Sequence, residues 1–351
     1  MQISSICVIS VLSKNTKFAK TPELKILVYR LSSIGDIVLT TPVVRNIRKK
    51  YPEAEIHFLT RKKYADLLGF NPYIDKLVTV EHAPKEILQD LQAEKYDYFI
   101  DLHRNIRSKA LKKKLWAKYS TFPKHNFKKY LYTRFKIQRM PGVHIVDRYM
   151  MAVQHLSVQN DDEGLDLFIN ENVSLPKLAH KEFITFAIGA TFNTKRYPFD
   201  QVASFIAIAP LPVYILGGPD EEETGARLEA ESNGKAVSWC GNLSLQQSAE
   251  MIRQSKLCIS NDTGMMHFAA ALQKPLISIW GSTVPAFGMY PYYPKSMQDK
   301  YIIMEVLGLK CRPCSKLGFK ECPKKHFKCM KEITPDHVLK ATEALLKNSG
   351  S

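Results

Sequence analysis

Short apolar runs alternate with amphipathic stretches along most of the chain. The β-branched runs at 24–31 (LKILVYRL) and 54–60 (AEIHFLT) predict buried strands, and 37–52 between them predicts one helix that ends at Pro52. Further strands are expected at 76–80, 97–102, 182–190, 212–218, 256–261 and 275–281. Strands that alternate with helices in this way are typical of parallel βαβ units.

The alternation occurs twice, on either side of an acidic, loop-like stretch at about 160–182. This pattern predicts two doubly wound α/β domains, at 1–170 (with an extension at 1–22) and 183–333. A final helix at 334–351 is expected to pack back on the N-terminal domain. Ligands of such sheets bind beyond the carboxyl ends of the strands, so we expect a cleft where the two domains face each other.

The composition, 45% hydrophobic and 24% charged residues, is ordinary for a soluble globular enzyme. No apolar run approaches the roughly 20 residues that a membrane-spanning helix needs. The first ten residues are apolar, but they lack the basic start and the cleavage site of a signal peptide. A cytoplasmic protein is therefore expected.

The chain is strongly basic, with a net charge of +16, and the excess is concentrated at 101–140. These forty residues hold thirteen Lys or Arg, one acid (Asp101) and several interleaved aromatic residues. Such a charge indicates a polyanionic partner, which could be a nucleic acid, an anionic membrane or a phosphorylated substrate. A solvated helix face is the alternative, and no recognised nucleic-acid-binding motif is present.

A small polar turn, Asp262-Thr263-Gly264, follows an apolar run and opens directly into a helix-like stretch. Free backbone N–H groups at a helix start, together with the helix dipole, favour a bound phosphate. His267 lies in the first turn of the same helix, within reach of such a ligand. The alternative is an ordinary helix cap with a packed histidine.

Three other turns that follow predicted strands carry candidate chemistry. Hydroxyls and cations at 188–200, including Thr191 and Lys195, suit a diphosphate, although an ordinary polar loop has the same composition. The acids after Gly217-Gly218-Pro219 could accept hydrogen bonds from ribose or simply begin a helix. Asp36 could act as a general base or as a capping residue.

Four of the seven cysteines are clustered near the C-terminus, with the spacing C-x2-C-x7-C-x6-C and a histidine, His326, nearby. The four are Cys311, Cys314, Cys322 and Cys329. Reduced thiols packed in a loop are the default interpretation, and a structural zinc site is the alternative. Disulfides are not expected without a secretory signal.

Several of these stretches together resemble the lipopolysaccharide heptosyltransferases of glycosyltransferase family 9. The resemblance lies in RLSSIGDIVLTTPVVRNIRKKYPEAEIHFLT, YDYFIDLHRNIRS, HIVDRYM, NDTGMMHFAAALQKPLISIWGST and the cysteine-rich CRPCSKLGFKECPKKHFKCM. The motifs occur in the family's order from about Leu24 to Ile333.

The resemblance implies a GT-B fold, in which two Rossmann-like domains face each other across the active site. It implies inverting transfer of heptose from ADP-heptose to a phosphorylated lipopolysaccharide inner-core acceptor, with no cofactor or catalytic metal. The donor would bind the C-terminal domain and the acceptor the N-terminal one. The protein would work in the cytoplasm, at the inner face of the inner membrane of a Gram-negative bacterium.

The family's site residues map onto specific positions of this chain. The general base falls on Asp36, and Glu221 is the best match for a ribose-binding acid, although Glu222 is adjacent. The remaining donor positions are Thr191, Lys195, Asp262, Thr263, Gly264 and His267. The acceptor candidates are Arg61, Arg104 and Arg107. Ala190 stands where some relatives carry a second hydroxyl.

Two alternative functions remain compatible with the residues. The motifs specify the diphosphate better than the sugar, so a GT-B transferase with another nucleotide sugar or acceptor is one. A basic nucleic-acid-binding protein without catalysis is the other, but it leaves Asp36 and the 257–282 block unexplained. With a glycolipid substrate, the basic region at 101–140 is expected to dock on an anionic membrane surface.

Overall fold

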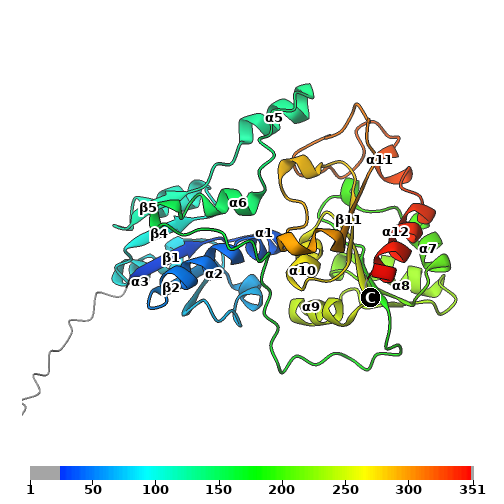
Figure 1. Ribbon diagram of the computed structural model, residues 1–351, viewed down its shortest axis with the longest axis horizontal. Coiled ribbons are helices and arrows are strands. Elements are labelled where there is room, and N and C mark those ends of the chain that lie inside the picture. Colours follow the sequence, from blue (N-terminus) through cyan, green and yellow to red (C-terminus); the bar gives the residue numbers. More distant parts are fainter. Residues whose placement is uncertain (1–23, 349–351) are drawn as a thin grey trace, which may run out of the picture.

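Two parallel sheets form the centre of the computed structural model, which describes residues 24–348 (Figure 1). The extension expected at 1–22 lies outside the described residues. The N-terminal sheet has the order β3-β2-β1-β4-β5 and the C-terminal sheet the order β11-β10-β9-β6-β7-β8. The strands are β1 (Lys25–Tyr29), β2 (Glu55–Arg61), β3 (Lys76–Val80), β4 (Tyr98–Asp101), β5 (Lys118–Thr121), β6 (Ile184–Ala187), β7 (Val213–Leu216), β8 (Ala236–Ser238), β9 (Leu257–Asn261), β10 (Leu276–Trp280) and β11 (Tyr301–Glu305).

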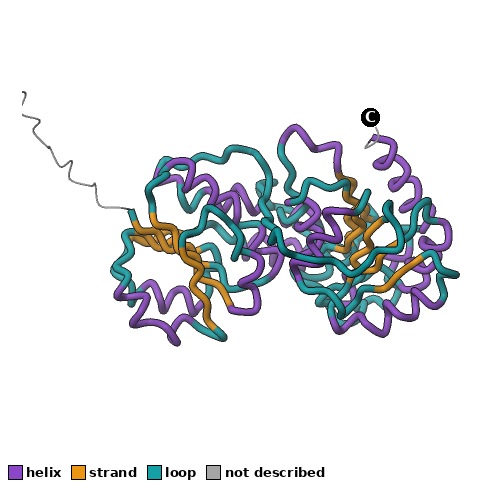
Figure 2. Tube along the Cα trace, turned by 90° about the horizontal axis from the view of Figure 1, so that it is seen from below, coloured by secondary structure: helices purple, strands orange, loops and turns teal. Residues whose placement is uncertain are grey.

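Helices surround each sheet, so that the molecule has two α/β lobes (Figure 2). The helices of the N-terminal lobe are α1 (Ile34–Val38), α2 (Thr41–Lys50), α3 (Leu88–Ala93), α4 (Ile106–Lys112), α5 (Asn126–Phe135) and α6 (Ile145–Met150). Those of the C-terminal lobe are α7 (Phe199–Ile208), α8 (Glu222–Ala230), α9 (Leu245–Gln254), α10 (Gly264–Ala271), α11 (Lys328–Lys331) and α12 (Pro335–Asn348). Within residues 24–348, no helix combines the length and the apolar character that crossing a bilayer requires.

The central strands are the apolar runs of the sequence. In β1, Ile26, Leu27 and Val28 are completely buried, and every residue of β9 and β10 is buried as well. β-Branched side chains covered on both faces are typical of parallel sheets that carry helices on each side. All strands of a sheet run in one direction, so their carboxyl ends, and the loops that follow them, share one edge.

The first helix differs from the expectation. One helix was expected over 37–52, but the structure has two, α1 and α2, which are separated at Leu39 and Thr40. The hydroxyl groups of Thr40 and Thr41 donate to carbonyl oxygens of α1, and Pro42 lies in the first turn of α2. Proline suits a first helical turn because it has no N–H to donate, and here it begins a new helix.

Strands β5, β8 and β11 were not expected from the sequence. Each lies at an end of its sheet, where one side of the strand has no neighbour. Most of their side chains are accordingly half-buried; Ala236 is buried and Lys118 is exposed. An edge strand therefore needs no continuous apolar run, and its signal in the sequence is weak.

The connection between the lobes carries neither helix nor strand from 157 to 183. It is tied to α2 by Arg45, whose guanidinium pairs with Asp161 at 2.8 Å and Asp166 at 2.5 Å. The C-terminal helix α12 packs on α7, β9 and β10, and its Val338 lies in the apolar core of the C-terminal lobe. It was expected on the N-terminal domain, so this placement is a correction.

Candidate functional site

Asp36 lies in the first turn of α1, directly beyond the carboxyl end of β1. Its carboxylate accepts a hydrogen bond from the Ser33 hydroxyl at 2.8 Å and pairs with the Arg30 guanidinium at 2.7 Å. Burial raises the pKa of Asp36, but Arg30 and Ser33 outweigh burial and hold that pKa below its usual range. The side chain is therefore an ionised carboxylate at neutral pH.

Arg30 is itself held in place by the N-terminal lobe. Its guanidinium donates to the carbonyl oxygens of Leu102 (2.6 Å) and Ser32 (2.6 Å) and to the Tyr149 hydroxyl (2.9 Å). Four partners, with Asp36 the fourth, leave the guanidinium little freedom. The carboxylate is thus oriented before any ligand binds, which is how catalytic groups are usually supported.

Helices α1 and α10 meet at the boundary between the two lobes (Figure 1). A Cβ atom on Gly35 would lie 2.6 Å from Cδ2 of His267, and one on Gly264 would lie 2.7 Å from Cγ2 of Ile34. Only glycine allows the two backbones to approach this closely. The contact places Asp36 of the N-terminal lobe against the Asp262-Thr263-Gly264 turn of the C-terminal lobe.

His267 lies at this contact, and only 3% of its surface is exposed. Burial lowers its pKa to about 4, although Asp262 and Asp36 both act to raise it. The ring is therefore neutral at physiological pH. Within the described residues its Nδ1 atom is buried and has no hydrogen-bond partner, which is unusual for a buried polar atom.

The other donor-side candidates surround the start of α10. The Lys195 ammonium pairs with the Asp262 carboxylate at 2.7 Å, and the Thr283 hydroxyl donates to the same carboxylate oxygen at 2.7 Å. Asp262 thus holds Lys195 beside the helix start. Thr263 is the N-cap residue of α10, and its hydroxyl lies 3.4 Å from that of Ser260.

Glu221 is buried beyond the carboxyl end of β7, with 7% of its surface exposed. Its carboxylate pairs with Arg196 at 2.6 Å and accepts the N–H of Gly218 at 3.0 Å. The neighbouring Glu222 is exposed and lies near Gly241 instead. Glu221 is therefore the acid that reaches the ligand edge of the sheet, where Thr191 is exposed in the loop after β6.

The three acceptor-side arginines all follow or end strands of the N-terminal sheet, but their contacts differ. Arg61, at the end of β2, and Arg107, in α4, both lie close enough to Tyr29 to lower its pKa, although burial raises that pKa overall. Arg104 donates instead to the carbonyl oxygen of Phe122 at 2.8 Å. Arg61 and Arg107 thus lie near Tyr29 at the carboxyl edge of the N-terminal sheet. Arg104 lies in the loop after β4 at the same edge, and its side chain supports the chain that leads to α5.

Sequence reasoning missed several charged residues near Asp36. Arg30 stands at the end of a predicted strand, six residues before Asp36, and this position was a usable signal. Lys124 and Lys129 were identified only as members of the basic region, and Arg148 only as part of the motif HIVDRYM, without a role of its own. Lys124 and Lys129 are near Asp36, and Arg148 is near Lys129, only because of how α5 and α6 pack, which no local pattern reveals.

The four clustered cysteines are free thiols. The Cys311 sulfur lies 3.7 Å from Nε2 of His326. Burial raises the pKa values of the Cys314 and Cys329 thiols, and the nearby Cys311 raises them further. Within residues 24–348, however, the only metal-ligand side chains that converge in a group of three are Glu55, His57 and Glu94. The zinc alternative for the cysteines stays a prediction.

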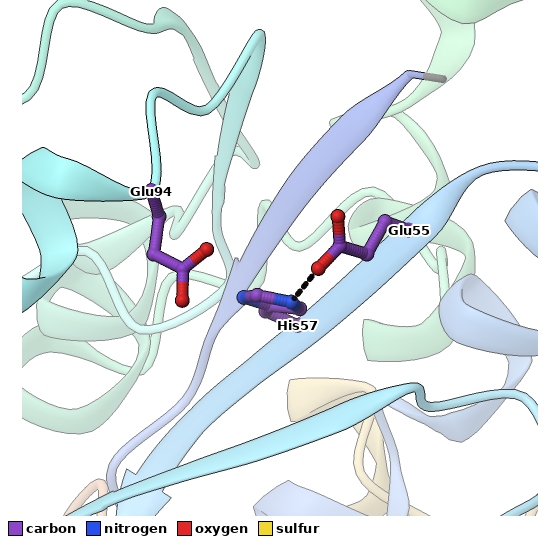
Figure 3. Close-up of side chains that lie close together, drawn as sticks. All are labelled: Glu55, His57 and Glu94. Carbon is purple, nitrogen blue, oxygen red and sulfur yellow. Dashed lines mark hydrogen bonds and ion pairs between the residues drawn. The ribbon is translucent and has the colours of Figure 1, made fainter.

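The converging group of Glu55, His57 and Glu94 is shown in Figure 3. Nε2 of His57 lies 2.7 Å from Glu55, and the Lys25 ammonium pairs with both glutamates. Lys76 pairs with Glu94 as well. The group lies at the amino ends of the strands, opposite the ligand edge, and its acids are neutralised by lysines. It is a charged network that holds β1, β2 and β3 together.

A family model for "Glycosyltransferase family 9 (heptosyltransferase)" matches residues 85–325. A curated relative, lipooligosaccharide heptosyltransferase 2 of Campylobacter jejuni, is 24% identical over 336 residues, which cover 93% of this chain and 99% of the relative. Among solved structures, the family 9 glycosyl transferase of Veillonella parvula superposes with a TM-score of 0.72 at 24% identity and covers 93% of this chain and 98% of its own.

An Escherichia coli heptosyltransferase solved with ADP superposes with a TM-score of 0.68 at 20% identity, and the match covers 91% of this chain and 99% of that one. These likenesses confirm the predicted GT-B fold, with its two parallel-sheet α/β lobes. The family match spans more than half of the chain and includes the loops after β6, β7 and β9 that carry the donor-side candidates. The protein therefore belongs to glycosyltransferase family 9, the heptosyltransferases.

Proposed function

We propose that this enzyme transfers heptose from ADP-heptose to a lipopolysaccharide inner-core acceptor, with inversion at the anomeric carbon. The observation that carries the proposal is the contact of α1 with α10, which sets the ionised Asp36 of one lobe against the phosphate-type turn of the other. The relatives named as heptosyltransferases, one of them solved with ADP, support the choice of donor.

The proposed reaction is a single displacement. Asp36 takes the proton of the acceptor hydroxyl as that oxygen forms a bond to the anomeric carbon of the heptose. The bond from the anomeric carbon to the phosphate oxygen breaks, and ADP leaves with both bonding electrons. Because the acceptor oxygen attacks the face opposite the leaving group, the configuration is inverted.

Donor binding is proposed at the carboxyl edge of the C-terminal sheet. The diphosphate lies at the start of α10, where Thr263, Gly264 and the Lys195 ammonium neutralise the charge that develops on ADP. Asp262 positions Lys195, since its carboxylate already accepts from that ammonium. No metal is needed for this task. Glu221 accepts from a ribose hydroxyl, and Thr191 contacts the phosphates from the loop after β6.

Acceptor binding is proposed at the carboxyl edge of the N-terminal sheet. Arg61 and Arg107 lie there, on the same side as Asp36, and suit the carboxylates and phosphates of an inner-core precursor. Arg104 contributes by supporting the chain before α5. An anionic acceptor also accounts for the excess of positive charge on this lobe.

The basic region divides into two parts in the structure. Lys112 ends α4, and Lys113 and Lys114 follow it before β5, at the sheet edge away from Asp36. Helix α5 follows β5 on the ligand edge and projects from the N-terminal lobe near the boundary between the lobes (Figure 1). It exposes Phe127 (71%) and Phe135 (57%). Exposed aromatics among cations suit an anionic membrane interface, so we propose that α5 contacts the inner face of the inner membrane.

A calorimetric titration with ADP-heptose and UDP-sugars, followed by product analysis, tests the donor assignment. We expect selective binding of ADP-heptose and an inverted heptoside product. Glu221→Gln should raise the Kd for ADP-heptose about tenfold, because the ribose loses a charge-assisted hydrogen bond. The adjacent Glu222→Gln is the matched control and should bind normally. Tight binding of a different nucleotide sugar would move the function to another GT-B transferase.

A further inference from the structure

Four cations from both lobes gather near Asp36, with Lys129 among the other three. Lys124 precedes α5, Lys129 lies in α5, Arg148 lies in α6, and Lys316 lies in the cysteine-rich loop of the C-terminal lobe. None of the four is in an ion pair within residues 24–348. A cluster of like charges in which no member is in an ion pair is costly in a protein, and a bound anion would reduce that cost.

Lys129 is at the centre of the cluster. Only 7% of its surface is exposed, and its ammonium makes no hydrogen bond within the described residues; it faces the Phe287 ring of the C-terminal lobe at 5.4 Å. Burial, with Arg148 and Lys316, lowers the pKa of Lys129 to about 7, while Asp36 acts to raise it. Lys129 is therefore close to the proposed base and lacks a partner of its own.

Arg148 provides independent support for an anion-binding site. Its side chain is completely buried, and one nitrogen donates to the carbonyl oxygen of Phe287 at 2.9 Å. Its Nε and the second terminal nitrogen have no partner within residues 24–348. Nearly all buried polar groups in proteins are hydrogen-bonded, so two free donors on one guanidinium need an explanation.

The two lobes are joined across this cluster. Lys136, which follows α5, donates to the carbonyl oxygens of Cys311 and Pro313 in the cysteine-rich loop, at 3.0 and 2.6 Å. Lys316 of the same loop donates to Asn126 at the start of α5, at 3.3 Å. The cations therefore come together only when α5 and the loop are side by side, as they are in this structure.

We propose that Lys124, Lys129 and Lys316, backed by Arg148, form an anion subsite that holds an acidic group of the acceptor while the acceptor hydroxyl meets Asp36. The inference rests on the proposed function and adds a second acidic contact to it. The donor diphosphate is assigned to Lys195 in the proposed function, and the charge of Lys195 acts on His267. The acidic group is either a carboxylate of an acidic sugar or a phosphate, since both are anions that accept hydrogen bonds from lysine and arginine side chains.

Steady-state kinetics of Lys129→Met test the subsite. Loss of a buried charge contact to the acceptor should raise the acceptor KM at least tenfold and leave the donor KM within about twofold. Lys128→Met removes the same charge from the neighbouring position of α5 and should leave both KM values unchanged. Because Lys129 is buried, Lys316→Met provides a second variant, at an exposed loop position, and should raise the acceptor KM in the same way. Unchanged acceptor KM values in both variants would overturn the proposal.

Two acceptor analogues identify the bound group, one without phosphates and one with its carboxylates converted to amides. The analogue that lacks the group held by the subsite should have a high KM with wild type, and Lys129→Met should not raise that KM further. If Lys129→Met raises the KM of both analogues by the same factor as that of the intact acceptor, the subsite is contradicted.

A titration with inorganic phosphate separates this proposal from the function. Saturable binding that is lost in Lys129→Met and kept in Lys195→Met supports the subsite even if no heptose is transferred. Binding lost only in Lys195→Met would place the anion at the donor turn and refute the subsite.

Discussion

At the scale of single residues, the charge of Asp36 is controlled by two opposing effects. Burial favours the neutral acid, whereas the Arg30 guanidinium and the Ser33 hydroxyl favour the carboxylate and prevail. A carboxylate with a low pKa is fully ionised at neutral pH, but it is also a weak proton acceptor. This suits a reaction in which bond formation to an electrophilic carbon makes the acceptor hydroxyl acidic only in the transition state.

Removal of the Arg30 charge should change the pH dependence of the enzyme. In Arg30→Met, burial is no longer outweighed, so the pKa of Asp36 rises and the carboxylate is protonated at higher pH. The acidic limb of kcat/KM should therefore move to higher pH, by at least one unit. Arg30→Lys keeps a charge at this position and should show a smaller shift. An acidic limb that stays in place in Arg30→Met would mean that Asp36 does not control it.

At the scale of secondary-structure elements, the site depends on the contact of two helix starts. Gly35 and Gly264 have no side chain, and each faces an atom of the other lobe that a Cβ would approach within 2.7 Å. The contact brings Asp36, the proposed base, to the proposed donor turn, and it is made of packing rather than of charge. A single methyl group can therefore separate the two halves of the site without altering any charged residue.

Gly35→Ala tests this contact. The added methyl group would have to displace the buried His267 ring, so the lobes should move apart and kcat/KM should fall at least tenfold. Gly69→Ala is the matched control, because a Cβ there comes no closer than 3.4 Å to another atom. Kinetics of both variants, together with thermal unfolding, check the prediction. Normal kcat/KM in Gly35→Ala would show that the contact is not needed for catalysis.

The strands also show which parts of the fold and of the site could be predicted from the sequence. Central strands such as β1 and β9 are buried on both faces and were predicted from their apolar runs. The edge strands β5, β8 and β11 are half-buried and gave no such run. The candidate residues that follow predicted strands, Asp36 and Asp262 among them, could be found because parallel sheets bind ligands there. Lys129 and Arg148 could not, since they meet Phe287 of the other lobe only through tertiary packing.

At the scale of the whole molecule, both substrates are expected to enter from the boundary between the lobes. Helix α5 stands beside that boundary (Figure 1). Its exposed side chains include aromatic residues and the cation Arg134. A glycolipid held in a membrane can present its sugar to Asp36 only if the boundary faces the bilayer. The projection of α5 on this side of the molecule is consistent with that orientation.

Vesicle binding tests this orientation. Replacement of Phe127 and Phe135 by Ser should weaken binding to vesicles with anionic phospholipid several-fold, because both rings lose apolar burial at the interface. Trp116→Ser is the matched control: Trp116 is 98% exposed but lies before β5, at the opposite edge of the sheet. Sedimentation with vesicles measures the difference. A larger loss in Trp116→Ser would assign the membrane contact to the far edge instead.

The central claim is that Asp36 is the base of a heptosyl transfer between the lobes, and one comparison tests it most directly. Wild type and Asp36→Asn would be measured side by side for ADP-heptose binding and for heptose transfer. Asn keeps the shape of the side chain but cannot accept the proton, so we predict normal donor binding and at least a roughly 100-fold loss of kcat. Transfer at the wild-type rate by Asp36→Asn would contradict the account.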